Sequence, residues 1–95
     1  MMNDTEMNYR VEMDKLAAGL AEKGIPFTYK ALFDGVQIRC SGWDAVCHRF
    51  SYGHEKGLIE IMGSIVQPGD DDVEGWLTAE EILARLQALE ARKDG

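Results

Sequence analysis

Every cysteine and histidine of the chain lies between positions 40 and 54, as Cys40, Cys47, His48 and His54. Thiolate sulfur and imidazole nitrogen are the ligands that zinc prefers, and a set of this kind can complete a tetrahedral structural site. The spacing matches no standard zinc finger and contains no Cys-x-x-Cys pair. Cys47 and His48, as neighbours, also point to opposite faces of a strand unless a bulge turns one of them. A zinc site is therefore one hypothesis for these residues, and two buried thiols with two ordinary histidines are the other.

Candidates for catalysis are few. Ser51 lies three positions from both His48 and His54, but no nucleophile-elbow motif surrounds it. Cys40 with His48 or His54 is a further pair that only proximity in space would support. The glycines form neither a phosphate-binding loop nor a dinucleotide fingerprint. We therefore expect that the protein is not an enzyme.

An acidic stretch follows the middle of the chain. It contains Asp70, Asp71, Asp72, Glu74, Glu80 and Glu81 with no basic residue among them. Consecutive aspartates do not form the alternating pattern of a calcium loop. A solvated loop leading into a helix explains them, and so does a surface that meets a basic protein. In the second case Trp76 is the expected anchor, with Asp70, Asp71, Asp72 and Glu74 around it, although a tryptophan here can also pack on the core.

Composition limits the class of protein. The chain has 95 residues, is 45% hydrophobic and carries a formal charge of −7, from 17 acidic and 10 basic residues. Such a charge argues against direct binding to nucleic acid and suits a basic protein partner. The sequence contains neither a membrane-spanning apolar run nor a signal peptide, so we expect a cytoplasmic protein with reduced thiols.

The order of elements indicates one α+β domain over residues 9–93, preceded by a disordered leader over residues 1–8. Apolar residues recur at helical spacing from Tyr9 to Leu20. Gly24 then suits the left-handed position that ends a helix, and Pro26 prevents its continuation. A second helix is predicted from Thr78 to Arg92, because Thr78 and Glu81 form a capping box and Leu77 and Ile82 a hydrophobic staple.

Three strands are expected between Phe27 and Phe50, with the turn of the first hairpin at Asp34-Gly35. This turn pairs apolar residues on one side of the sheet: Phe33 with Val36, Ala31 with Ile38, and Tyr29 with Cys40. The second turn, near Ser41-Gly42-Trp43-Asp44, leaves two registers open. One register puts Cys47 on the face of Ile38 and Cys40. The other, which the Val-x-His-x-Phe alternation favours, buries Val46 and Phe50 and partly covers His48.

A fourth strand is predicted at residues 58–62, followed by an exposed connection over residues 67–75. The resulting fold class is α+β, with an antiparallel sheet of three or four strands between an N-terminal and a C-terminal helix, in the order α-β-β-β-β-α. Both helices are expected to cover one face of the sheet. The other face carries Lys30, Gln37 and Arg39 and is either wet or a binding surface.

Four segments carry a resemblance: FDGVQI, CHRFSYG, GLIEIMG and GWLTAEEIL. Together they resemble short uncharacterised proteins of bacterial phages and mobile elements, over nearly the whole chain after Lys15. Inhibitors of CRISPR effector nucleases come from such loci, and several are similarly small, acidic and α+β. The resemblance implies an anti-CRISPR inhibitor that acts by protein-protein interaction on a nuclease surface, and it assigns no individual residue.

Two functions are therefore expected. The first is a small non-enzymatic protein that binds a basic protein surface, with a CRISPR effector nuclease as the concrete case. The alternative is a structural or regulatory module stabilised by zinc at Cys40, Cys47, His48 and His54.

Overall fold

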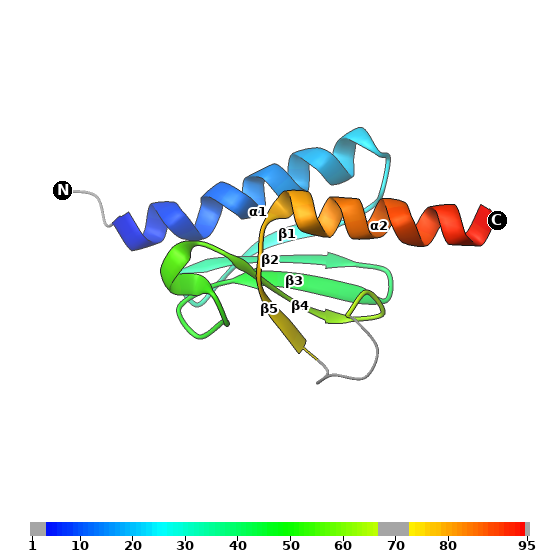
Figure 1. The fold of residues 1–95 in the computed structure, drawn as a ribbon. Helices are drawn as coiled ribbons and strands as arrows, with labels where there is room; N and C mark the ends of the chain where they lie inside the picture. The colour runs from blue at the N-terminus through cyan, green and yellow to red at the C-terminus, as the bar shows by residue number, and fades with distance from the viewer. Residues whose placement is uncertain (1–3, 67–72, 95) are drawn as a thin grey trace.

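A computed structural model describes residues 4–66 and 73–94 of the chain (Figure 1). The described elements, in order, are α1 (Asp4–Glu22), β1 (Thr28–Leu32), β2 (Gly35–Cys40), β3 (Trp43–Cys47), the short 3₁₀ helix η1 (His54–Lys56), β4 (Ile59–Gly63), β5 (Val73–Leu77) and α2 (Ala79–Asp94). The α+β class and the order of helix, antiparallel strands and helix are as predicted. The sheet has five strands rather than three or four.

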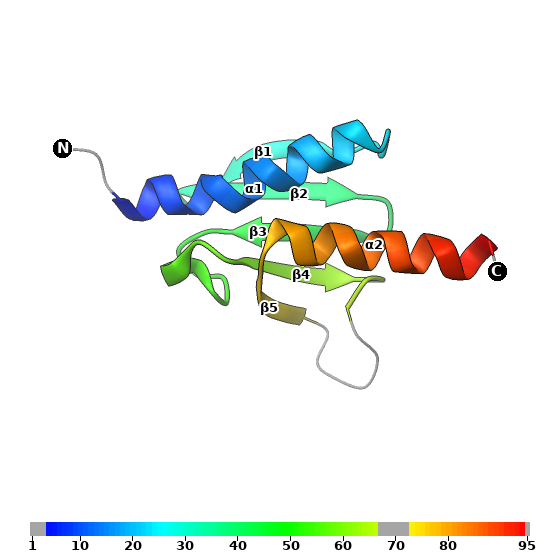
Figure 2. The same cartoon turned by 45° about the horizontal axis from the view of Figure 1, so that its top comes forward.

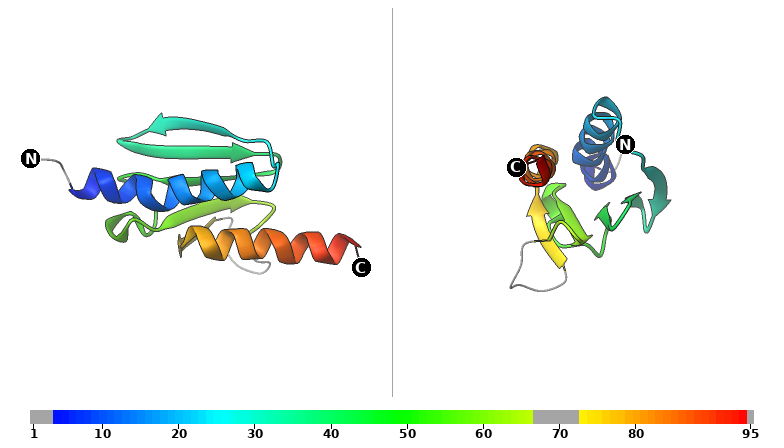
Figure 3. Two further views of the ribbon diagram at one scale, coloured as in Figure 1. Left: turned by 90° about the horizontal axis from the view of Figure 1, so that it is seen from above. Right: turned by 90° about the vertical axis from the view of Figure 1, so that its right-hand side faces the viewer.

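The strands form an antiparallel meander in the order β1-β2-β3-β4-β5 (Figure 2). Both helices lie on the same face of this sheet, as predicted, and leave the other face without a helix (Figure 3). Residues 73–75 were predicted to belong to an exposed connection, which is wrong, because they begin β5. Acidic residues and glycine are rare in strands. Here Leu77 pairs with Ile59 and supplies the apolar contact that holds the strand.

The first helix buries the predicted apolar stripe of Tyr9, Met13, Leu16 and Leu20. It begins at Asp4 rather than Tyr9, so the chain is helical within part of the predicted leader. Acidic residues suit the first turn of a helix, and the prediction had considered only burial.

The end of α1 is as predicted. Gly24 has φ 72°. The Ile25 N–H donates to the Leu20 carbonyl at 2.9 Å, and the Gly24 N–H donates to the Ala21 carbonyl at 3.1 Å. This pair of hydrogen bonds is a Schellman motif.

The first hairpin turns one residue earlier than predicted. Leu32 pairs with Gly35, so Phe33 and Asp34 form the loop, with φ values of 48° and 67°. All three predicted apolar pairs are therefore wrong, because Ala31 pairs with Val36 and Tyr29 with Ile38, although the faces are preserved. Gly35 belongs inside β2, because a Cβ there would lie 2.7 Å from the His48 Cα and in contact with the Cys47 carbonyl. The close approach of β2 to β3, rather than the hairpin turn, therefore requires glycine at this position.

The second hairpin adopts the register that the sequence pattern did not favour. Cys40 pairs with Trp43 and Val36 with Cys47, so Cys47 shares the core face with Ile38. Val46 is buried on the opposite face, and Phe50 is 66% exposed rather than buried. Ser41 and Gly42 form the two-residue loop, and the φ of 86° at Gly42 suits it. This turn sets the register, and the alternation of Val46, His48 and Phe50 is not strand alternation because β3 ends at Cys47.

The second helix begins with a capping box and contacts the first helix at two places. The capping box of α2 forms as predicted, with the Glu81 N–H donating to the Thr78 hydroxyl and the Thr78 N–H donating to the Glu81 carboxylate. The Glu12 carboxylate of α1 accepts a hydrogen bond from the Ala79 N–H at 2.8 Å. Gly19 faces Leu83, whose Cδ2 lies 2.9 Å from where a Cβ would be. Gly19 therefore permits the close packing of α1 against α2.

Candidate functional site

The strand register separates the two cysteines. Cys40 pairs with Trp43 at one end of β2, whereas Cys47 pairs with Val36 near the other end. Cys40 and Val36 are four positions apart, which corresponds to about 13 Å along a strand. Cys40, Cys47, His48 and His54 are thus not brought together as one set of ligands. Over residues 4–66 and 73–94, no group of three or more histidine, cysteine, aspartate or glutamate side chains is placed to hold a metal ion.

Neither cysteine has the character of a nucleophile. Cys47 is fully buried in the core, and desolvation, with a smaller contribution from Glu12, raises the pKa of its thiol to about 12. Desolvation also raises the pKa of Cys40, and Asp44 raises it further. Both residues therefore remain protonated thiols at neutral pH.

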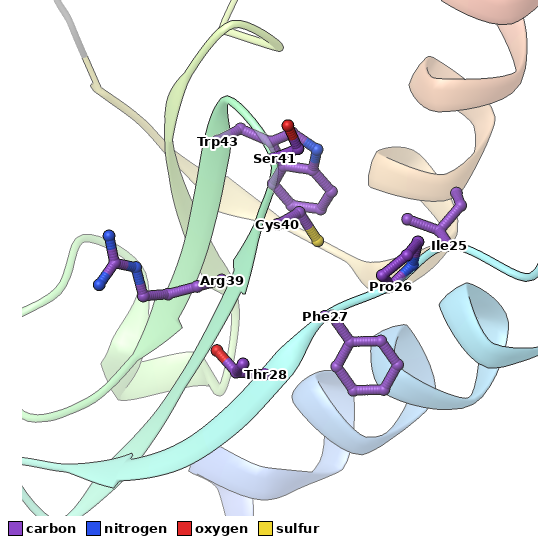
Figure 4. A pocket seen from close by; sticks show the side chains of 8 residues that line it. All are labelled: Ile25, Pro26, Phe27, Thr28, Arg39, Cys40, Ser41 and Trp43. Atoms are coloured by element: carbon purple, nitrogen blue, oxygen red, sulfur yellow. The ribbon is translucent and has the colours of Figure 1, made fainter.

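Cys40 lines a pocket of about 330 Å³ at the end of the sheet where β1 and β2 diverge. The pocket is formed by Ile25, Pro26, Phe27, Thr28, Arg39, Cys40, Ser41 and Trp43. Figure 4 shows the Cys40 sulfur pointing toward the segment before β1 and the Arg39 guanidinium pointing away from it. The pocket thus contains apolar surface and a thiol but no acid-base pair.

Ser51 has a structural role. Its hydroxyl donates to the His48 carbonyl at 2.9 Å and accepts from the His48 N–H at 3.0 Å. The serine therefore closes the turn after β3 by bonding to backbone rather than to an imidazole. Because the side chain is only 2% exposed, it is not accessible to a substrate.

The two histidines are also engaged. The His48 Nδ1 accepts a hydrogen bond from the Phe50 N–H at 3.1 Å. Burial lowers the pKa of His48, while Glu60 raises it and His54 lowers it. The Nδ1 of His54 lies 3.2 Å from the Tyr9 hydroxyl. The His48 contact thus lies within the loop of residues 48–57, and the His54 contact joins this loop to α1.

This loop gathers exposed aromatic side chains. Phe33 and Phe50 pack edge to face with ring centroids 5.3 Å apart, and Phe33 makes a similar contact with His48 at 5.3 Å. The Arg49 guanidinium lies 5.1 Å from the Phe50 ring centroid and 3.2 Å from the Asp34 carboxylate. The loop therefore packs against Phe33 and Asp34 at the tip of the first hairpin.

The same loop also contacts β5. The Trp76 N–H donates to the Tyr52 carbonyl at 3.5 Å, and the Tyr52 N–H donates to the Glu60 carboxylate at 2.9 Å. Gly75 permits the contact, because a Cβ at this position would collide with the Tyr52 side chain. We call the four aromatic residues that the loop connects the aromatic surface; they are Phe33, Phe50, Tyr52 and Trp76, which are 52%, 66%, 61% and 50% exposed.

Two residues of the aromatic surface have a left-handed backbone. Phe33 has φ 48° and Trp76 has φ 63°. Such a conformation costs a bulky residue about 1–3 kcal/mol. At Phe33 the two-residue hairpin loop requires it. Phe33 and Trp76 thus expose large apolar rings to solvent, and each also has a strained backbone conformation.

The structure describes only part of the predicted acidic site. Asp70, Asp71 and Asp72 lie outside the described residues. Glu74 forms a bidentate ion pair with Arg85, with N···O distances of 2.7 and 2.8 Å. Arg85 also donates to the Ile65 carbonyl at 3.1 Å. Glu74 therefore links β5 to α2, whereas Trp76 is exposed as an interface anchor would be.

Sequence reasoning did not assign Phe33, Phe50 and Tyr52 to a site. A usable signal was present, because two aromatic residues flank the polar turn that follows Cys47-His48. Nothing in the sequence, however, indicates that this turn reaches both the first hairpin and β5.

No model of a known protein family matches the chain. Comparisons with curated proteins and with solved structures also gave no significant match. Within the described residues, neither helix combines the length and apolar character needed to cross a membrane.

Proposed function

We propose that this protein is a non-enzymatic binding protein whose aromatic surface contacts another protein. The observation that carries the proposal is the joining of Phe33, Phe50, Tyr52 and Trp76 by one loop, with each of them at least half exposed. Phe33 and Phe50 are in ring contact, and Trp76 bonds to Tyr52 through the backbone. Large exposed aromatic side chains are enriched at protein interfaces.

The charge of the protein favours a basic partner. The formal charge of −7 opposes association with other acidic proteins and accelerates encounter with basic ones. The pair of Arg49 and Asp34 stands at the margin of the aromatic surface, where it contributes more to orientation than to affinity. The rings are then expected to supply most of the binding energy.

A narrower form of the proposal is inhibition of a CRISPR effector nuclease. It is supported by the resemblance to small phage and mobile-element proteins and by the acidic charge. An acidic protein with an apolar contact surface can occupy a basic groove that otherwise holds nucleic acid.

The proposal is tested by comparing the proteins that wild-type and variant baits capture from a bacterial lysate, quantified by mass spectrometry. Phe50→Ser and Trp76→Ser remove rings from the aromatic surface. Val11→Ser is the matched control, because Val11 is 49% exposed and lies on α1. We expect both aromatic substitutions to lose the same captured proteins and the control to retain them. Equal capture by all baits would contradict the role of this surface.

The inhibitor form needs its own assay. DNA cleavage by a panel of purified CRISPR effector nucleases is measured with wild-type protein, Phe50→Ser and Val11→Ser. Inhibition that only the Phe50 substitution relieves would support the narrower proposal. Cleavage unaffected by the wild-type protein across the panel would remove it while leaving the binding proposal to the capture experiment.

A further inference from the structure

The outer edge of β1 carries backbone groups that no strand uses. Leu32 and Gly35 flank the two-residue loop and therefore form a hydrogen-bonded pair. Pairs alternate along an antiparallel ladder, so Lys30 bonds to Gln37, whereas Tyr29 and Ala31 belong to non-bonded pairs. The N–H and C=O groups of Tyr29 and Ala31 consequently point away from β2.

These groups remain available at the surface. β1 is the first strand of the sheet, and none of the described strands pairs with its outer side. Tyr29, Lys30 and Ala31 are all exposed, and the strand contains no proline or bulge. In the described part of the chain, no hydrogen bond beyond the ladder involves the backbone of Tyr29 or Ala31. An edge of this kind is a template for another strand.

Charged side chains of both signs lie around this edge, since Asp44 pairs with Arg39 across β2 and β3. Lys30 and Arg39 lie on the helix-free face at diagonal positions of neighbouring strands. Neither forms an ion pair with a described carboxylate. On the helix side, Tyr29 donates to Asp14, and Arg10 lies near enough to lower its pKa. Lys30 is thus the one charged side chain of β1 itself, on a protein whose formal charge is −7.

We propose that the edge of β1 binds an extended acidic segment of a partner protein as a sixth strand. The main chain of that segment bonds to Tyr29 and Ala31. Its alternate side chains fall on the helix-free face, where an acidic group meets Lys30. The remaining side chains lie beside Tyr29 and Ala31 and are apolar. This surface is separate from the ring contacts proposed above, so either proposal can fail alone.

One two-fold pairing with a second copy of this chain is unfavourable. In a two-fold antiparallel pairing that bonds Tyr29 of one copy to Ala31 of the other, Lys30 faces Lys30 in a non-bonded pair. Like charges directly opposite one another destabilise such a pair. A lysine on an edge strand is also a common means of preventing self-association.

The experiment is an amide NMR titration of the ¹⁵N-labelled protein with a blocked synthetic peptide of alternating glutamate and valine, at about 0.15 M ionic strength. A peptide of alternating lysine and valine is the control probe. Ala31→Pro removes an outward N–H without touching the ladder to β2, which an edge strand tolerates. Lys30→Glu reverses the local charge and leaves the backbone intact.

We expect saturable shifts at Tyr29 and Ala31, slower hydrogen exchange of both amides, and weak binding of the lysine peptide. Ala31→Pro should lower the affinity about tenfold, as loss of a backbone hydrogen bond predicts. Lys30→Glu should lower it while a folded spectrum is kept. Absence of saturable shifts at β1, shifts confined to the aromatic surface, or equal binding of both peptides would overturn the proposal. A dimer seen by sedimentation and abolished by Ala31→Pro would assign the edge to a second copy instead.

Discussion

The strands β1 and β5 are the two edges of one sheet, and they are protected to very different degrees. β5 pairs with β4 through an irregular register between Ile59 and Ile61. Its backbone also bonds to Tyr52 and its Glu74 side chain is held by Arg85. β1 has a regular ladder to β2 and an open outer side. One edge has an irregular register and contacts from Tyr52 and Arg85, and the other is left as bare backbone.

The two edges therefore differ in how far their residues are used to stabilise the fold and how far they are left for binding another protein. β1 is held by hairpin geometry and ladder bonds, so its outer side can change partner without loss of the fold. β5 is held by tertiary contacts, so its residues are less free to serve another protein. Substitutions should therefore destabilise β1 by disturbing hairpin geometry or ladder bonds, and β5 by removing tertiary contacts.

The largest expected effect follows Gly35→Ala, which tests whether close approach to β3 fixes the β1–β2 hairpin. The new Cβ would meet the Cys47 carbonyl and lie 2.7 Å from the His48 Cα, and both contacts are with backbone. We expect a loss of about 3 kcal/mol or more in the free energy of unfolding, measured by urea denaturation. Gly24→Ala is the control, because Gly24 has φ 72° but no atom within 4 Å, and strain alone should cost about 1 kcal/mol. Similar losses in the two variants would mean that the steric account is wrong.

A smaller effect is expected from Glu74→Gln, which tests whether side chains close the β5 edge. The ion pair with Arg85 is partly buried, with side-chain exposures of 19% and 26%, so its loss should cost about 1–2 kcal/mol. Hydrogen exchange should rise in β5 and remain unchanged in β1. Asp34→Asn removes the more exposed pair with Arg49 at the first hairpin and should cost less than about 0.5 kcal/mol. Equal losses in the free energy of unfolding for the two substitutions would contradict this expectation.

The smallest effect concerns pH and the loop of residues 48–57. Burial lowers the pKa of His48 in the folded state below about 6.5, its value in an unfolded chain. The unfolded state then binds more protons, so stability should fall as pH decreases from about 6.5 toward the lowered folded pKa. Glu60 and His54 modulate this shift in opposite directions.

His48→Asn isolates the contribution of His48, because it removes the titrating group and can retain an acceptor for the Phe50 N–H. The difference in melting temperature between wild type and this variant, followed from pH 7 to pH 5, should change with pH. A constant difference would show that His48 does not gain a proton on unfolding.

The parts of the fold that depend on neighbouring residues were predictable from sequence. Gly24 ends α1 and the pair of Thr78 and Glu81 caps α2, since each motif lies within one helical turn. The α+β class also followed from the order of periodic segments. These signals need no knowledge of the tertiary structure.

The errors arose where a distant contact decided the outcome. Asp34-Gly35 is a strong turn signal, but the backbone of β3 requires Gly35 inside β2. β5 was missed because Arg85 and Leu77, which hold it, lie outside the predicted connection of residues 67–75. The aromatic surface combines three segments, so only the three-dimensional structure could assemble it.

The left-handed conformations of Phe33 and Trp76 also have a consequence for directed evolution. A library selected only for resistance to heat should enrich asparagine and glycine at both positions, because these residues adopt positive φ with less strain. A library selected for capture of a partner should retain the aromatic rings. Positions at which the two selections disagree would then outline the binding surface.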